Sequence, residues 1–269
     1  MILSSAWETA APQLLALVAL AAYALAAWPG RLTERFAAAA LPCGVAAHAA
    51  LLGVEIFGSG GPAAGVRLGF GPVLSLTICL VLAVHTVESR FLPLPSVRRV
   101  LAIIGAAAVV LALVYPGEPR LLGSTWAPLH WLLGVASYGL FGAAVLHALL
   151  LDAAERRMRH HQRGEAAAFG LPLLHLERLT FRFVQAGFAV LSVVIVLGIV
   201  TATKWRWDHK TLLSMLGWLI FATLLGGRHW RGWRGQRATR WLYAGALVLL
   251  LAYVGYRFVL EVLLGRTSA

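Results

Sequence analysis

The sequence predicts an all-α fold, a polytopic membrane helix bundle with about eight transmembrane helices. Three observations support this fold class. The chain of 269 residues is 60% hydrophobic and only 13% charged, and its mean hydropathy is +0.79. Its long segments are apolar on every side, whereas a helix of a soluble domain is apolar on one face only. Its charged residues lie mostly in the connections, which is typical of a chain surrounded by lipid.

Eight apolar stretches approach or exceed the length that crosses ~30 Å of hydrocarbon as a helix. The seventh is short, and the eighth carries Arg257 and Glu261. Residues 1–12 contain no Lys or Arg, so we expect the first stretch to remain as an uncleaved helix. Together the stretches predict a single transmembrane domain over residues 1–269. They are residues 12–28, 36–53, 70–87, 100–115, 127–151, 179–200, 211–227 and 241–264.

The distribution of Lys and Arg predicts the orientation of the chain. These residues are concentrated in the first, third, fifth and seventh connections. Because positively charged loops stay in the cytoplasm, these connections, including residues 152–175, are predicted to be cytoplasmic. Both termini and residues 201–210 then lie outside, and the protein is a multi-pass protein of the cell inner (cytoplasmic) membrane. This topology explains the net charge of +12, so we expect no nucleic-acid binding.

The two cysteines, Cys43 and Cys79, lie in apolar stretches. Neither belongs to a CxxC redox pair or to a CxxCH motif. Both are therefore interpreted as ordinary small apolar side chains.

Histidines inside apolar stretches are candidate site residues, because lipid does not satisfy their ring nitrogens. At ~1.5 Å of rise per residue, His48 in the second stretch and His130 at the start of the fifth reach one depth in the outer half of the membrane. For this pair, a hydrogen bond to a neighbouring helix and ligation of a metal are comparable alternatives. His85 and His147 share a depth at the inner edge, where we interpret them as interfacial and keep them as a reserve pair.

The same rise places Arg257, in the eighth stretch, at the depth of the outer histidines. Its guanidinium either pairs with Glu261 at i,i+4 spacing or meets an acidic group of a ligand. On the fifth stretch, Gly134 and Ser137 follow His130 at helical spacing, with Tyr138 at the margin of that face. Small residues of this kind admit a planar ligand or another helix.

The outer connection between the sixth and seventh stretches carries Trp205, Trp207 and Asp208. Tryptophans at the membrane surface usually act as anchors. Two that are spaced two residues apart are also able to form a platform for a large aromatic ligand. The spacing leaves both alternatives open.

Three motifs resemble the cytochrome c assembly superfamily (CcsA/CcmC-like). They are HWLLGVASYGLF at His130–Phe141, WRWD at Trp205–Asp208 and GWRG at Gly232–Gly235. The haem-exporting members carry more Trp and Gly ahead of WRWD and a histidine after the last helix, both of which are missing here. The resemblance is therefore closest to the HemX and YpjD-like membrane protein branch. It implies haem binding at His130 and, more weakly, haem transfer to an apocytochrome.

The resemblance and the residues together predict a haem-binding membrane protein that supports cytochrome c biogenesis or haem handling at the outer face of the membrane, and that is not an enzyme. We expect His48 and His130 to be the axial ligands of a non-covalent haem b. Arg257 would pair with a propionate, and Tyr138, Trp205, Trp207 and Asp208 would line or cover the cofactor. Expected partners are haem, membrane lipid and other cytochrome c maturation proteins or an apocytochrome.

An alternative function is a haem-free transporter or regulatory membrane subunit. In it, the same outer histidines, together with Arg257 and Glu261, line a polar pathway for an ion or a small anion. An absorption spectrum separates the two functions, because bound haem has an intense Soret band.

Overall fold

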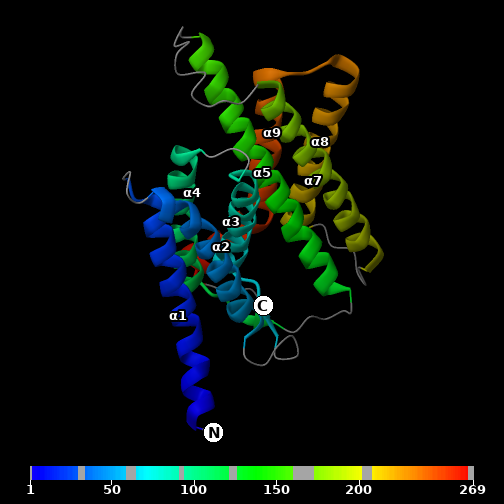
Figure 1. Cartoon of the computed structure of the whole chain (residues 1–269). Helices are drawn as coiled ribbons and strands as arrows, with labels where there is room; N and C mark the ends of the chain where they lie inside the picture. Colours follow the sequence, from blue (N-terminus) through cyan, green and yellow to red (C-terminus); the bar gives the residue numbers. More distant parts are fainter. Residues whose placement is uncertain are drawn as a thin grey trace. The chain divides into compact units, whose positions relative to one another are not determined.

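The computed structural model describes residues 2–29, 34–58, 65–90, 94–120, 126–159, 173–201 and 208–265. Within these ranges, eight helices are long and apolar enough to cross a membrane, which confirms the predicted fold class. The last of the eight changes its winding along its length. The helices are α1 (Ile2–Ala27), α2 (Glu34–Phe57), α3 (Phe70–Glu88), α4 (Pro95–Val114), α5 (Ala127–Arg159), α7 (Leu173–Thr201), α8 (His209–Arg231) and the joined segments α9 (Gly235–Leu250), η3 (Leu251–Gly255), α10 (Tyr256–Phe258) and η4 (Val259–Leu263) (Figure 1).

Helix ends follow local signals in the sequence. Helix α4 begins at Pro95, a residue whose missing amide hydrogen costs nothing in the first turn. Helix α8 begins after Asp208, whose side chain accepts a hydrogen bond from the backbone amide of Thr211. It ends at Gly232, which has a φ of +64°, a left-handed conformation that favours glycine. These signals set the ends of α8, which is longer than the predicted seventh apolar stretch, residues 211–227.

The chain divides into two compact units. Unit 1 comprises Met1–Thr125 and Arg257–Ala269, and unit 2 comprises Trp126–Tyr256. In unit 1, α1 packs against α2 and α4, and α3 packs against α2 and α4 (Figure 1). The buried ring of Tyr23 lies where Gly44 and Gly105 approach it, and a Cβ added at either glycine would meet the ring at about 3.0 Å. Glycine at these two positions therefore makes room for the aromatic ring.

A short antiparallel ladder lies at one end of unit 1. Strand β1 (Val66–Arg67) pairs with β2 (Pro119–Arg120), so that Val66 faces Arg120. Just beyond the ladder, Gly69 and Gly117 touch through their backbones, since a Cβ on Gly69 would lie 2.6 Å from the Gly117 Cα. The φ of Gly117 is +76°. Only glycine at both positions allows this crossing.

Unit 2 has its own hydrophobic core between α5, α7, α8 and α9. The rings of Phe141 and Phe221 stack at 3.9 Å between centroids. Gly187 and Gly245 pack against these two rings, where a Cβ would meet them at 3.0 and 2.8 Å. The core is therefore built from large rings placed opposite glycines, which is how membrane helices approach one another closely.

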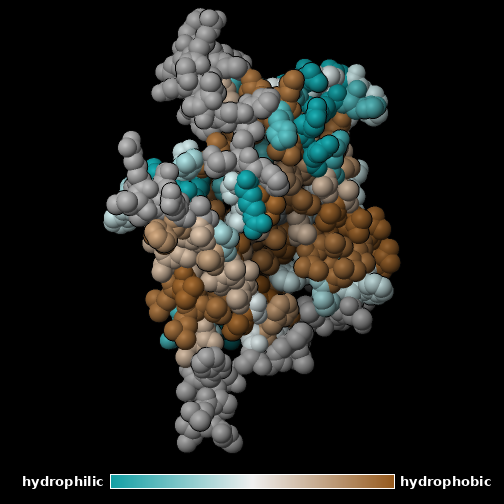
Figure 2. Space-filling view, viewed as in Figure 1, coloured by the Kyte–Doolittle hydropathy of each residue, from teal (hydrophilic) through white to brown (hydrophobic). Residues whose placement is uncertain are grey.

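Large apolar side chains also cover the outside of unit 2, as on α7, where Val196 is 58% and Val200 75% exposed. Figure 2 shows hydrophobic side chains over this part of α7 and hydrophilic ones at the end where α8 passes into α9. A protein in water rarely exposes a large contiguous apolar surface. Lipid is the solvent that fits this surface, and the protein is a multi-pass membrane protein.

Candidate functional site

His48 is held by hydrogen bonds from two other helices of unit 1. Its Nδ1 atom lies 3.0 Å from the Tyr23 hydroxyl of α1, and its Nε2 atom lies 2.7 Å from the Ser75 hydroxyl of α3. All three side chains are fully buried. The hydrogen-bonded alternative for His48 is therefore the one the structure shows, and ligation of a metal at Nε2 requires Ser75 to release that atom.

His130 has fewer hydrogen-bond partners than His48. It begins the second turn of α5 and packs on α7 in unit 2, where a Cβ added at Gly198 would lie 3.1 Å from the ring carbon Cε1. Its Nδ1 atom is buried without a hydrogen bond of good geometry. A half-buried imidazole whose Nδ1 lacks a well-aligned hydrogen bond is a candidate metal ligand.

The predicted ligands fall into different units. His48 and Arg257 belong to unit 1, and His130 belongs to unit 2. The convergence of the three side chains on one ligand therefore stays a prediction. Within the described ranges, no group of three or more His, Cys, Asp or Glu side chains is placed to hold a metal ion.

The reserve histidines are both buried. His147 Nδ1 lies 2.7 Å from the Ala143 carbonyl one turn earlier in α5, and its ring lies against that of Phe183 at 5.2 Å between centroids. His85 is in the last turn of α3 in unit 1. These two residues also belong to different units.

Arg257 forms the ion pair that its spacing predicts. Its Nη1 atom donates to Glu261 Oε1 at 2.8 Å. The second carboxylate oxygen of Glu261 accepts a hydrogen bond of 2.8 Å from the backbone amide of Phe70, the first residue of α3. The carboxylate thus caps α3, whose N-cap residue Gly69 supplies no side chain for that purpose.

The face of α5 after His130 has mixed surroundings. A Cβ added at Gly134 would meet nothing within 4 Å, so there is open space beside it. Ser137 donates to the Gly134 carbonyl. Tyr138 donates to the Leu249 carbonyl of α9 at 2.6 Å, two residues before the winding becomes π-helical. The predicted planar-ligand face thus has room beside Gly134.

Comparison with known proteins identifies the family. A family described as "Cytochrome C assembly protein" matches residues 69–264. The chain belongs to this family. The inner membrane protein YpjD of Escherichia coli is 28% identical over 92% of this chain and 98% of its own length. Within the family, the chain therefore lies in the YpjD-like branch.

Two further relatives carry the name cytochrome c biogenesis protein CcsA. That of Chlamydomonas reinhardtii is 29% identical over 52% of this chain and 40% of its own length. That of Prochlorococcus marinus strain NATL1A is 34% identical over 30% of this chain and 27% of its own length. No solved structure matches the chain.

The WRWD motif of this family member is only partly described. Asp208 caps α8 by accepting from the amide and the hydroxyl of Thr211 at 2.9 and 2.8 Å. Trp205 and Trp207 lie outside the described residues. Lys210, just after the motif, lies over the Tyr256 ring at 4.8 Å. Aromatic and cationic groups therefore meet beside the predicted outer connection.

The GWRG motif forms the turn between α8 and α9. Gly232 and Gly235 have φ values of +64° and +56°, and the Trp233 ring packs on Gly227 of α8. The same ring stacks on Trp241 at 5.6 Å and lies under the Arg237 guanidinium. In this family member the motif is a tight helical turn locked by an aromatic ring.

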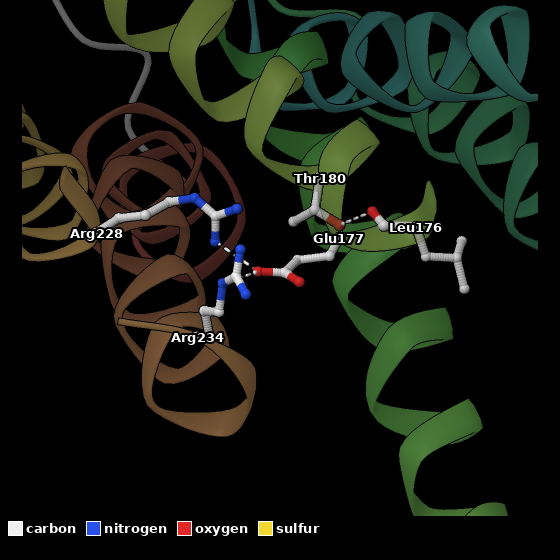
Figure 3. A network of polar contacts seen from close by, with 5 residues as sticks. All are labelled: Leu176, Glu177, Thr180, Arg228 and Arg234. Carbon is white, nitrogen blue, oxygen red and sulfur yellow. Dashed lines mark hydrogen bonds and ion pairs between the residues drawn. The ribbon is translucent and has the colours of Figure 1, made fainter. Parts of the chain in front are cut away.

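Sequence reasoning missed the polar network beside this turn. Glu177 of α7 accepts from Arg228 at 2.8 Å and lies 3.5 Å from the Arg234 Nε atom (Figure 3). The Arg228 guanidinium also lies 3.6 Å above the Phe181 ring. The sequence feature that could have revealed this network is Glu177, a single acidic residue near the start of a long apolar helix. Its partners lie in the Arg-rich connection between α8 and α9.

Tyr23 and Ser75 were also missed. Both are polar side chains within apolar stretches, but their helices carry other polar residues too, so the sequence alone does not single them out. Tyr23 and His48 lie before the residues matched by the family, whereas Ser75, His130 and Arg257 lie within them.

Proposed function

We propose that this cytochrome c assembly family member is a haem-binding protein of the inner membrane, which supports cytochrome c biogenesis or haem handling at its outer face. The family match over residues 69–264 carries the proposal. The names of the relatives, an inner membrane protein and cytochrome c biogenesis proteins, support the compartment and the process. We propose binding and positioning of haem, not catalysis.

His130 fits the role of an axial ligand. It is a buried imidazole with a nitrogen that lacks a good hydrogen bond, in the helix that carries the family-like run His130–Phe141. His48 is proposed as the second ligand because of the depth it is predicted to share with His130, although both of its ring nitrogens are hydrogen-bonded in the structure. When bound, haem supplies an iron centre whose electron affinity its ligands tune.

Arg257 is proposed to pair with a haem propionate. A guanidinium carries five donors in a planar fork, and Glu261 accepts from Nη1. The pair with Glu261 would hold the fork in place while a propionate meets another edge of it. Tyr138 and Asp208 are proposed to line the site, and Trp205 with Trp207 to cover its outer edge, because an indole has no acceptor nitrogen for iron.

The proposed topology places both termini and the WRWD motif outside, with residues 152–175 in the cytoplasm. The proposed partners are therefore proteins that act at the outer face, namely other cytochrome c maturation proteins or an apocytochrome. Membrane lipid surrounds the apolar surface.

The deciding experiment is an absorption spectrum of the protein purified in detergent after expression with added haem precursor. A Soret band together with the sharp visible bands of a low-spin haem supports haem binding. Extraction of the haem by acid and organic solvent then shows that it is non-covalent haem b. A protein that carries no Soret band under these conditions and takes up none from added haemin contradicts the proposal.

A haem-free transporter or regulatory subunit is the second candidate function. One observation favours it: the protein itself provides hydrogen-bond partners for both ring nitrogens of His48 and a carboxylate for Arg257. Side chains satisfied in this way are able to line a polar pathway without any cofactor. The same spectrum separates the two functions.

A further inference from the structure

The turn between α8 and α9 gathers arginines at one end of unit 2. A turn that joins two membrane-spanning helices lies at a membrane surface. Trp230 marks the level of this surface, because its ring is 83% exposed and lies back over Gly226, one turn earlier in α8. Figure 2 shows hydrophilic side chains at this end of unit 2. Four arginines here are exposed: Arg231, Arg234, Arg237 and Arg240.

The nearby acid Glu177 is occupied by other arginines. It accepts a hydrogen bond from Arg228 and lies 3.5 Å from the Arg234 Nε atom (Figure 3). Among the residues that the structure describes, no carboxylate lies within ion-pair distance of Arg237 or Arg240. The positive charge of these two side chains is therefore not compensated by the described part of the chain.

Arg237 is held in place by an aromatic ring. Its guanidinium lies 4.3 Å from the centre of the Trp233 ring, which is only 7% exposed. Trp233 in turn packs on Gly227 and stacks on Trp241 at 5.6 Å. Stacking uses the face of a guanidinium and leaves the N–H groups at its edge available to a phosphate, which Arg binds with two parallel hydrogen bonds. Arg237 is therefore pre-organised to bind a phosphate group.

Arg237 and Arg240 share one face of α9 with apolar residues. The exposed residues of this face follow at spacings of three and four, namely Arg237, Arg240, Ala244 and Leu247. The arginines lie at the membrane-surface end of the face, and Leu247 lies deeper. An acyl chain along the apolar part therefore brings the phosphate of its lipid to the level of the two arginines.

We propose that Arg237 and Arg240 bind the phosphate of an anionic phospholipid whose acyl chains lie along the exposed face of α9. An anionic headgroup fits better than a zwitterionic one. The amine of a zwitterionic headgroup would bring another positive charge to residues 228–240, which already carry five arginines. The lipid site lies within unit 2 and is independent of haem.

The test uses the full-length protein, purified in a non-ionic detergent and titrated with phosphatidylglycerol or phosphatidylcholine of the same acyl chains. Native mass spectrometry counts the bound lipids and gives their relative affinities. The wild-type protein should bind phosphatidylglycerol roughly tenfold more tightly than phosphatidylcholine, because only the former carries a net negative charge. Equal affinity for the two lipids overturns the proposal.

Inorganic phosphate distinguishes a lipid site from a site for free phosphate. Phosphatidylglycerol should raise the thermal unfolding midpoint of the wild-type protein in detergent, since it binds the folded state. Inorganic phosphate at the same concentration should not, because it lacks the acyl chains that contact α9. Equal stabilisation by both would assign the arginines to free phosphate and overturn the lipid site.

The variants test the two arginines. Arg240→Gln should weaken phosphatidylglycerol binding by roughly fivefold, the contribution of one basic residue near a membrane surface. Arg237→Gln together with Arg240→Gln should weaken it by roughly twentyfold. Arg237→Lys keeps the charge but loses the stacked planar fork, and should still weaken binding severalfold. The matched control is Arg67→Gln with Arg90→Gln, which removes two exposed positive charges from unit 1 and should bind like the wild-type protein.

Three outcomes of the variants count against the site. An equal loss of affinity in the control and in the double variant of α9 would show that net charge alone attracts the lipid. Wild-type affinity in Arg240→Gln, whose exposed side chain leaves the fold intact when replaced, overturns the proposal even if the double variant fails to fold. Wild-type affinity in Arg237→Lys contradicts phosphate binding by the stacked guanidinium.

Discussion

Arg257 and Glu261 form a buried ion pair one helical turn apart, and their side chains are only 8% and 10% exposed. Removing one member of such a pair leaves the other charge without compensation. Glu261→Ala also removes the acceptor for the Phe70 amide. We therefore expect this change to lower the free energy of unfolding by about 3 kcal/mol, measured by thermal or denaturant unfolding in detergent.

Companion variants separate the charge from the cap. Glu261→Gln keeps an oxygen for the Phe70 amide and should lose less stability than Glu261→Ala. The double change Arg257→Met with Glu261→Leu removes both charges and should recover much of the loss. Glu118→Ala, at an exposed acid of the same unit, is the control and should change little. Equal stability of Glu261→Ala and this control would refute the importance of the pair.

Gly117 should be the less replaceable of two glycines with similar backbone conformations. Gly58 and Gly117 have φ values of +60° and +76°, but a Cβ at Gly58 would meet nothing within 4 Å, whereas one at Gly117 would lie 2.6 Å from the Gly69 Cα. Gly58→Ala should cost about 1 kcal/mol from the backbone conformation alone. Gly117→Ala should cost about 3 kcal/mol or more, since two backbones must also separate. Equal unfolding midpoints would contradict the crossing.

The histidine variants test which pair ligates haem. His48→Ala and His130→Ala should each lose the low-spin spectrum and most of the haem, because each removes one axial ligand. His85→Ala and His147→Ala should keep both. The reverse pattern would place the haem site at the inner edge of the membrane.

The two tryptophans of the WRWD motif should affect retention and not ligation. Replacing Trp205 and Trp207 together by Ala should speed the loss of haem during detergent washing, with an unchanged low-spin spectrum. Trp230→Ala is a suitable control, since this tryptophan is 83% exposed at the end of α8. Retention equal to that of the control would reduce both residues to membrane anchors.

Orientation is testable by cysteine labelling in a background with Cys43 and Cys79 replaced by Ala. A cysteine at Gln162 should resist a membrane-impermeant maleimide in intact cells and react after permeabilisation. A cysteine at Ser268 should react in both cases. Labelling at Gln162 alone in intact cells would invert the topology.

The fold class was predictable because each helix is apolar along a length that matches the bilayer. The ends of α8 follow from Asp208 and Gly232, whose roles as cap and stop are readable in the sequence. The Arg257–Glu261 pair follows from i,i+4 spacing. All of these features depend on residues close together in the chain.

The partners of His48 and Glu261 were not predictable in this way. Tyr23 and Ser75 reach His48 from other helices, and Glu261 reaches Phe70 across 191 residues. In helices that are apolar on every side, hydropathy does not reveal which face meets a neighbour. The position of His48 along its helix predicts a depth in the membrane, but it does not identify the side chains around His48.

The Phe70–Glu261 hydrogen bond has a consequence for biosynthesis. The ribosome makes α1 to α4 first, yet the carboxylate that caps α3 belongs to η4, the last helical segment described. During translation the first amide of α3 therefore waits for its partner while all of unit 2 is being made. Unit 1 therefore begins to fold before unit 2 is made, but this contact of unit 1 forms only after unit 2 has been synthesised.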